Sequence, residues 1–207
     1  MPHNPSVNRT RGPVSDEVKA LRKAERRSQL IAAAIAIYGE YGYRHASVRQ
    51  VCEAAGLTQR YFYESFSHSD ELLIACYERV TDELQQDILV AVDAAGDAPR
   101  TRARAALAAY LTALKREPQA ANVFLVDIRG ISPAVDRQID DALSVTGRHM
   151  VRAVLRREPD IDDLLLAGVM GGIIHIALRW VTANYEPTID QVVDAALRLT
   201  TPLLQEE

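Results

Sequence analysis

Apolar residues recur every three or four positions along most of the chain, and glycine and proline interrupt the pattern at intervals. This spacing places apolar side chains on one face of an α-helix. Helices are expected over about residues 18–41, 47–55, 58–66, 69–95, 100–116, 119–128, 132–157, 161–184 and 187–204. No segment is predicted to be a strand. The sequence therefore predicts an all-α protein of about nine helices.

Residues 47–66 are predicted to form two short helices joined by a tight turn. Ser47 and Gln50 have the spacing of a capping box at the start of the first helix. Gly56 stands where a helix end favours positive φ, and Thr58 is placed to cap the second helix. The outer positions of that second helix carry long donors and aromatic rings: Gln59, Arg60, Tyr61 and Tyr63. This pattern is typical of a DNA-binding helix-turn-helix rather than of an inert helical hairpin.

Residues 26–73 resemble the N-terminal domain of the tetracycline-repressor (TetR) family. The matching positions lie at the end of the first helix and in and after the helix-turn-helix: Tyr38 within residues 34–42, Ser47-Val48-Arg49, Ala54-Ala55-Gly56-Leu57-Thr58, Tyr63, Phe66 and Leu72. The resemblance implies a transcriptional regulator with a three-helix DNA-binding domain and a larger helical domain that binds a small molecule and dimerises. The chain departs from the family at Ser69, where the family usually has a Lys that binds a DNA phosphate.

Charge is distributed unevenly along the chain. Residues 1–70 hold ten Lys/Arg and seven Asp/Glu, whereas residues 71–207 hold fourteen Lys/Arg and twenty-one Asp/Glu. The first segment therefore has a net charge of +3, the second −7, and the whole chain −4. A basic segment attracts the phosphates of DNA, and an acidic one is expected to stay away from them. We therefore expect a flexible tail over residues 1–17, a DNA-binding domain over 18–68 and an effector-binding and dimerisation domain over 69–207.

The residues expected to contact double-stranded DNA are polar or aromatic and lie on or just before the two helices of the motif: Ser47, Arg49, Thr58, Gln59, Arg60, Tyr61 and Tyr63. An arginine can donate two hydrogen bonds to a guanine edge, and a glutamine can pair with adenine. The hydroxyl groups suit phosphate oxygens. Two copies of the second helix in successive major grooves would require an inverted-repeat operator.

The segment over residues 164–178 is apolar nearly all round, which is unusual for a helix on the surface of a monomer. It falls short of the ~18–20 residues that a membrane span needs, so we expect no membrane helix. Small residues on this helix and an apolar stripe on the last helix predict a homodimer interface that includes Gly168, Gly172, Val192, Ala196 and Leu199.

Large or polar side chains on the apolar helices of the second domain are candidates to bind an apolar or amphipathic effector: Tyr110, Phe124, His149, Met170, His175 and Trp180. His175 lies deep in the apolar run, where a buried imidazole needs a partner. For each side chain taken alone, ordinary core packing or a satisfied buried group is the favoured interpretation. A regulator without an effector therefore remains an alternative.

The sequence shows no spacing typical of catalysis or metal binding. Cys52 and Cys76 form no CxxC motif and no Cys/His cluster, and no nucleophile stands near a base. No catalytic residue, metal or cofactor is predicted, and a helical enzyme is the disfavoured alternative. The polar first residues do not form a signal peptide, so a cytoplasmic protein is expected. The combined prediction is a homodimeric repressor that an effector releases from its operator.

Overall fold

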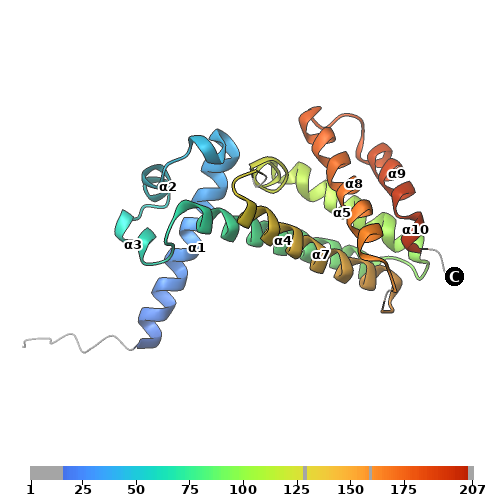
Figure 1. The fold of residues 1–207 in the computed structure, drawn as a ribbon, viewed down its shortest axis with the longest axis horizontal. Coiled ribbons are helices and arrows are strands. Elements are labelled where there is room, and N and C mark those ends of the chain that lie inside the picture. The colour runs from blue at the N-terminus through green and yellow to red at the C-terminus, as the bar shows by residue number, and fades with distance from the viewer. Residues whose placement is uncertain (1–15, 128–129, 159, 205–207) are drawn as a thin grey trace, which may run out of the picture.

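The computed structural model describes residues 16–127, 130–158 and 160–204. All regular elements within these residues are helical, in the order α1 (Asp16–Tyr41), η1 (Tyr43–His45), α2 (Val48–Ala54), α3 (Gln59–Tyr63), α4 (Ser69–Ala94), α5 (Pro99–Arg116), α6 (Pro118–Asn122), η2 (Val123–Asp127), α7 (Pro133–Leu155), α8 (Asp163–Thr182), α9 (Ile189–Leu199) and α10 (Thr201–Leu204) (Figure 1). The prediction of an all-α fold is confirmed. Most of the tail expected over residues 1–17 lies outside the described residues, and α1 begins at Asp16.

The described residues form ten α-helices, against about nine expected, mainly because the last predicted helix is divided. Pro202 has no backbone N–H, so a continuous helix would lack the hydrogen bond from this position to the preceding turn. Thr200 ends α9 and its Oγ1 donates to the Leu197 carbonyl oxygen at 2.8 Å. The predicted helix over 119–128 also differs, because α6 continues into the wider π-helical segment η2.

Helices α1, α2 and α3 lie together at the N-terminal end of the molecule (Figure 1). Their buried apolar side chains belong to a core that continues through α4 into the rest of the protein. The Ser47 capping box is confirmed, since Gln50 N donates to Ser47 Oγ at 3.3 Å and Ser47 N donates to Gln50 Oε1 at 2.9 Å. Gly56 has the expected positive φ of 66°. Thr58 is the N-cap residue of α3, as predicted, but its side chain makes no capping hydrogen bond. The short α3 is anchored instead by Phe62, whose side chain is fully buried.

The second part of the molecule is built around α4, which begins under the helix-turn-helix and continues through the rest of the protein (Figure 1). Helix α5 packs along α4, and α7 contacts both α4 and α8. Helices α8 and α9 form a pair at the far edge of the molecule from α3 (Figure 1). Helix α4 therefore belongs to both parts of the molecule.

Candidate nucleic-acid interface and ligand cavity

The surface around α3 carries the residues expected to contact DNA. Arg60 and Tyr63 are well exposed, with 84% of the Arg60 side chain and 63% of Tyr63 accessible. Gln59 and Thr58 at the start of α3 are also exposed, as are the other predicted contacts on and before α2, namely Ser47 and Arg49. Each of these predicted residues is therefore accessible, and Tyr61 is half-buried.

Two of the arginines on this surface are already paired with glutamates one helical turn away. Arg60 Nε lies 3.0 Å from Glu64 Oε1, and Arg49 Nε lies 2.7 Å from Glu53 Oε1. The hydrogen bond and charge of Glu53 raise the pKa of Arg49. Exposed ion pairs of this kind contribute little to stability because water screens them. DNA phosphates or guanine edges can therefore replace the glutamates at small cost.

Arg26 on α1 takes part in this surface, although the sequence did not single it out. Its Cζ lies 4.3 Å from the centroid of the Tyr61 ring, and its Nη2 lies 3.7 Å from Glu64 Oε2. The guanidinium therefore covers one face of the Tyr61 ring. Only the basic character of the first turns of α1 hinted at this role.

The position where the family usually has Lys is the first residue of α4, Ser69. Two of the backbone donors around it are already used, because Glu71 N donates to His68 Nδ1 at 3.3 Å and Ser67 N donates to Glu71 Oε2 at 2.7 Å. The Ser67 backbone hydrogen bond lowers the pKa of Glu71. Asp70 adds a second carboxylate in this turn, so the start of α4 is poorly suited to a phosphate.

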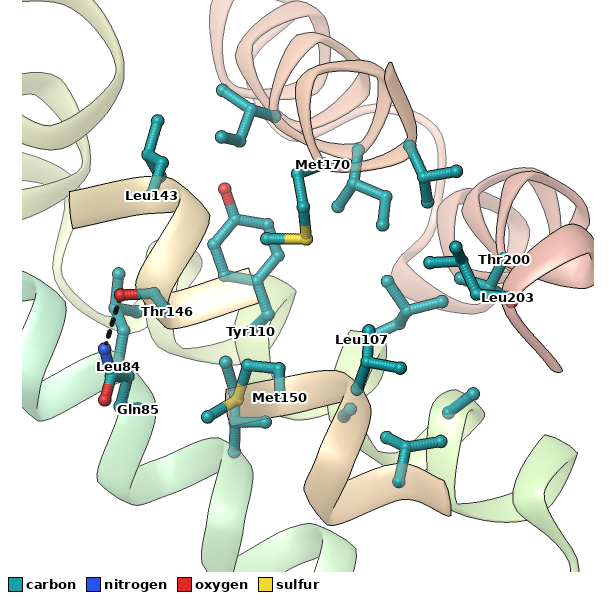
Figure 2. Close-up of a pocket in the computed structure, with 18 of the residues that line it drawn as sticks. Leu84, Gln85, Leu107, Tyr110, Leu143, Thr146, Met150, Met170, Thr200 and Leu203 are labelled. Atoms are coloured by element: carbon teal, nitrogen blue, oxygen red, sulfur yellow. Dashed lines mark hydrogen bonds between the residues drawn. The ribbon is translucent and has the colours of Figure 1, made fainter. Parts of the chain in front are cut away.

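A cavity of about 130 Å³ lies between α4, α5, α7, α8 and α10 (Figure 2). Its lining is mostly aliphatic, with two flexible methionines, Met150 and Met170, and one aromatic ring from each of Tyr110 and Phe124. Among the described residues that line it, none is charged. Five side chains carry a hydroxyl or an amide: Thr81, Gln85, Tyr110, Thr146 and Thr200. Such a site suits an apolar ligand with few polar groups.

Three of the six effector candidates line this cavity: Tyr110, Phe124 and Met170. The other three do not, and their assignment is corrected. His149 and His175 are exposed on the outer faces of α7 and α8. Trp180 is buried away from the cavity, where its Nε1 donates to the Pro187 carbonyl oxygen at 2.7 Å. The lining face of α8 is formed by Val169, Met170, Ile173 and Ile174, one helical turn apart in two pairs.

The outer face of α8 is apolar and accessible. Leu164 is 83% exposed, and Gly168, Gly171 and His175 follow it at helical spacing on the same exposed side. Helix α8 is 20 residues long and apolar enough to span a membrane by length and composition, so the expectation that the run was too short is corrected. Buried core helices pass the same test, which makes this weak evidence for a membrane. Only 22% of the most apolar 18-residue stretch of α8 is buried within the protomer.

Part of the predicted dimer interface is wrong. Val192 and Ala196 are 4% and 2% exposed and belong to the protomer's own core. Gly172 faces Leu199 of the same chain, since a Cβ on Gly172 would lie 2.9 Å from Leu199 Cδ1. Gly168 remains a candidate, because a Cβ there would meet no atom within 4 Å, and Leu199 is 38% exposed.

A helix-turn-helix joined to a larger helical unit is typical of a DNA-binding regulator. Residues 30–76 match the family described as bacterial regulatory proteins, tetR family. The matched segment and the similar proteins below support a TetR-family DNA-binding transcriptional regulator, since the family and these relatives are transcriptional regulators and not enzymes.

Similar proteins include both a transcriptional activator and a transcriptional repressor. The chain is 29% identical over 174 residues to the transcriptional activator FasR of Mycolicibacterium smegmatis. This match covers 84% of the chain and 78% of FasR. It is 23% identical over 190 residues to the transcriptional repressor KstR of Rhodococcus jostii, covering 91% and 87%. The fold is similar to the FadR regulator of Bacillus subtilis solved in complex with stearoyl-CoA, with a TM-score of 0.66, 16% identity and coverage of 86% and 97%.

Proposed function

We propose that this protein is a homodimeric repressor that binds an inverted-repeat operator through α3 and leaves it when a small apolar or amphipathic effector occupies the cavity. The observation that carries the proposal is the position of α4. Its N-terminal end packs in the core of the DNA-binding unit through Leu72 and Leu73, and its later turns line the cavity through Thr81, Leu84 and Ile88. One rigid helix therefore connects the ligand site to the DNA surface.

The accessible face of α8 supports the dimer. Leu164, Gly168 and Gly171 on α8 and Leu199 on α9 present apolar or small side chains to solvent at the edge of the molecule. Small residues let two helices approach closely, and a two-fold axis through this face would bury it against its own copy. Such a dimer would hold two copies of α3 apart, as two half-sites require.

The character of the cavity supports an apolar or amphipathic effector, and the FadR structure that contains stearoyl-CoA is a similarly folded protein with a ligand of that kind. We propose that the protein represses transcription, as its relative KstR does. A DNA-binding regulator of this kind acts in the cytoplasm, where its operator lies.

Selection of binding sites from random DNA tests the DNA half of this proposal. The expected result is an inverted repeat whose half-sites lie about one helical turn apart, bound by one dimer. Recovery of a single half-site bound by a monomer would contradict it. Titration of the protein–operator complex with apolar ligands tests the proposed response to an effector. The expected result is that the protein dissociates from the operator when the ligand binds.

A further inference from the structure

Glu64 is paired with two arginines at once. It is the C-cap residue of α3, and 36% of its side chain is accessible. Arg60 Nε lies 3.0 Å from Glu64 Oε1, and Arg26 Nη2 lies 3.7 Å from Glu64 Oε2. Each carboxylate oxygen therefore has its own guanidinium, one from α3 and one from the neighbouring α1 (Figure 1).

The two arginines differ in how firmly they are held. The Arg60 side chain is 84% accessible, whereas that of Arg26 is 25% accessible. Arg26 also has a second contact, because its Cζ lies 4.3 Å from the centroid of the Tyr61 ring. A cation is attracted to the face of an aromatic ring, and an exposed ion pair contributes little to stability. Arg60 can therefore leave Glu64 at small cost, while Arg26 stays beside it.

The charge of Glu64 becomes unfavourable when DNA approaches. DNA carries a dense array of negative phosphates, and a carboxylate close to them without a counter-charge is repelled. If Arg60 turned from Glu64 to a guanine edge and no other cation replaced it, this repulsion would cancel part of the binding energy that Arg60 contributes. Arg26 supplies the replacement charge, because it already lies within ion-pair distance of the second carboxylate oxygen.

The next residue on α1, Arg27, provides a contrast. Its Cζ lies 4.9 Å from the centroid of the Phe66 ring, so it also covers an aromatic side chain that follows α3. Its charge acts on a different carboxylate, that of Glu71, whose pKa is lowered mainly by the Ser67 backbone hydrogen bond and also by Arg27. The two neighbouring arginines therefore serve different carboxylates.

From these contacts we infer that Arg26 is a positioning residue for DNA binding, which neutralises Glu64 when Arg60 leaves the carboxylate for the operator. The inference rests on the DNA half of the proposed function, in which Arg60 contacts the operator. Arg26 acts through Glu64 and Arg60 rather than by its own contact with DNA. The loss of Arg26 should therefore matter only while residue 64 carries a negative charge.

A double-mutant cycle on the full-length protein tests the inference, with affinity for the selected operator measured by fluorescence anisotropy at constant salt. Arg26→Gln is expected to weaken binding by roughly 3- to 10-fold, because Glu64 is left without a counter-charge when Arg60 leaves it. Combined with Glu64→Gln, the same substitution is expected to change the affinity by less than about twofold, because no carboxylate then needs to be neutralised. Arg27→Gln is the matched control and should have the same effect with and without Glu64→Gln.

Two further measurements distinguish positioning from a structural role. Arg26→Gln is expected to relax base preference at the same operator position as Arg60→Ala, because Arg60 then remains with Glu64. Arg26→Lys keeps a positive charge beside Glu64 and is expected to retain more affinity than Arg26→Gln. A merely structural arginine would give an equal loss with and without Glu64→Gln and would leave base preference unchanged.

An equal loss of affinity from Arg26→Gln with and without Glu64→Gln would overturn the inference, and so would unchanged affinity in Arg26→Gln alone. A weaker salt dependence together with an equal loss would assign Arg26 to a DNA phosphate instead. If selection yields an inverted repeat but the cycle shows no coupling, the proposed function stands and the inference fails. If selection yields a single half-site bound by a monomer and the cycle on that site shows coupling, the inference stands and the proposed dimeric function fails.

Discussion

Gly39 on α1 lies so close to Gln119 on α6 that a Cβ added to the glycine would be 2.5 Å from both Cα and Cβ of the glutamine. One turn later, Asn122 Nδ2 donates to the Gly39 carbonyl oxygen at 3.1 Å. Helix α6 continues directly into η2, where Phe124 lines the cavity and stacks on Tyr77 with ring centroids 5.4 Å apart. The cavity wall and the surface on which α1 rests therefore belong to one short segment, which gives a second connection besides α4.

Gly39→Val is expected to push α1 away from α6, because the atoms in the way include backbone atoms that cannot rotate aside. The loss should be about 1–3 kcal/mol in the free energy of unfolding, together with weaker coupling between effector and operator binding. Urea unfolding and operator titration with and without effector measure both effects. Gly96→Val, in a loop where a Cβ meets no atom within 4 Å, is the control. Unchanged stability in Gly39→Val would show that the close approach is not required.

Arg60→Ala is expected to lower affinity for the selected operator by about 1–3 kcal/mol and to relax base preference at one position, since a guanidinium can bind a guanine edge. Its ion pair with Glu64 is replaced easily because both groups are on the surface. Arg79→Ala removes an ion pair of the same geometry, with Glu83 on α4, and serves as the control. Fluorescence anisotropy on operator variants is the measurement. An equal loss on every sequence would show that Arg60 contacts only phosphate.

Gly171→Arg is expected to convert the dimer into a monomer at micromolar concentration without unfolding the protomer. The residue is exposed on the outer face of α8, and a Cβ there meets no atom within 4 Å, so the variant protomer can fold. A charged side chain in an apolar two-fold interface would be buried without a partner. Sedimentation and circular dichroism test this, with Gly96→Arg as the control. A dimer that survives the substitution would place the interface elsewhere.

The residues expected to contact DNA are accessible or, at Tyr61, half-buried. The helices and the capping box at Ser47 could be predicted because they depend on local spacing along the chain. The side of α8 that faces the cavity could not be predicted. This helix is apolar nearly all round, so periodicity gives no sign of which side meets the cavity, and His175 fell on the wrong one. Gly172 was misassigned for the same reason, because its contact is Leu199 of its own protomer. The cavity is a property of packing between helices that are far apart in the chain, so it has no signature in sequence.

The stability of the protein is expected to fall as the pH rises from 9 towards 12. Burial raises the pKa of the Cys76 thiol from 9.0 to about 12, so the folded state keeps a proton that the unfolded state releases over this interval. The contribution is full below pH 9 and is lost on the alkaline side. Urea midpoints measured at pH 8 and pH 10.5 should decline less in Cys76→Val than in the original protein. An equal decline would assign the effect to other groups, such as Tyr38, whose pKa burial also raises.

Effector binding is expected to change the distance between the two copies of α3 by a few ångströms in the dimer. The two copies must stand about one helical repeat of DNA apart, roughly 34 Å, to enter successive major grooves. Helix α4 joins the cavity to the DNA-binding unit. A ligand that displaces the later turns of α4 would therefore also move its first turn, and the two copies of α3 would no longer have the separation that DNA requires. The effector needs to favour the wrong spacing by several kcal/mol to empty the operator. Spin labels introduced near Tyr61 in each protomer measure the separation in the free, effector-bound and DNA-bound dimers. Equal separations in all three states would exclude α4 as the element that transmits the signal.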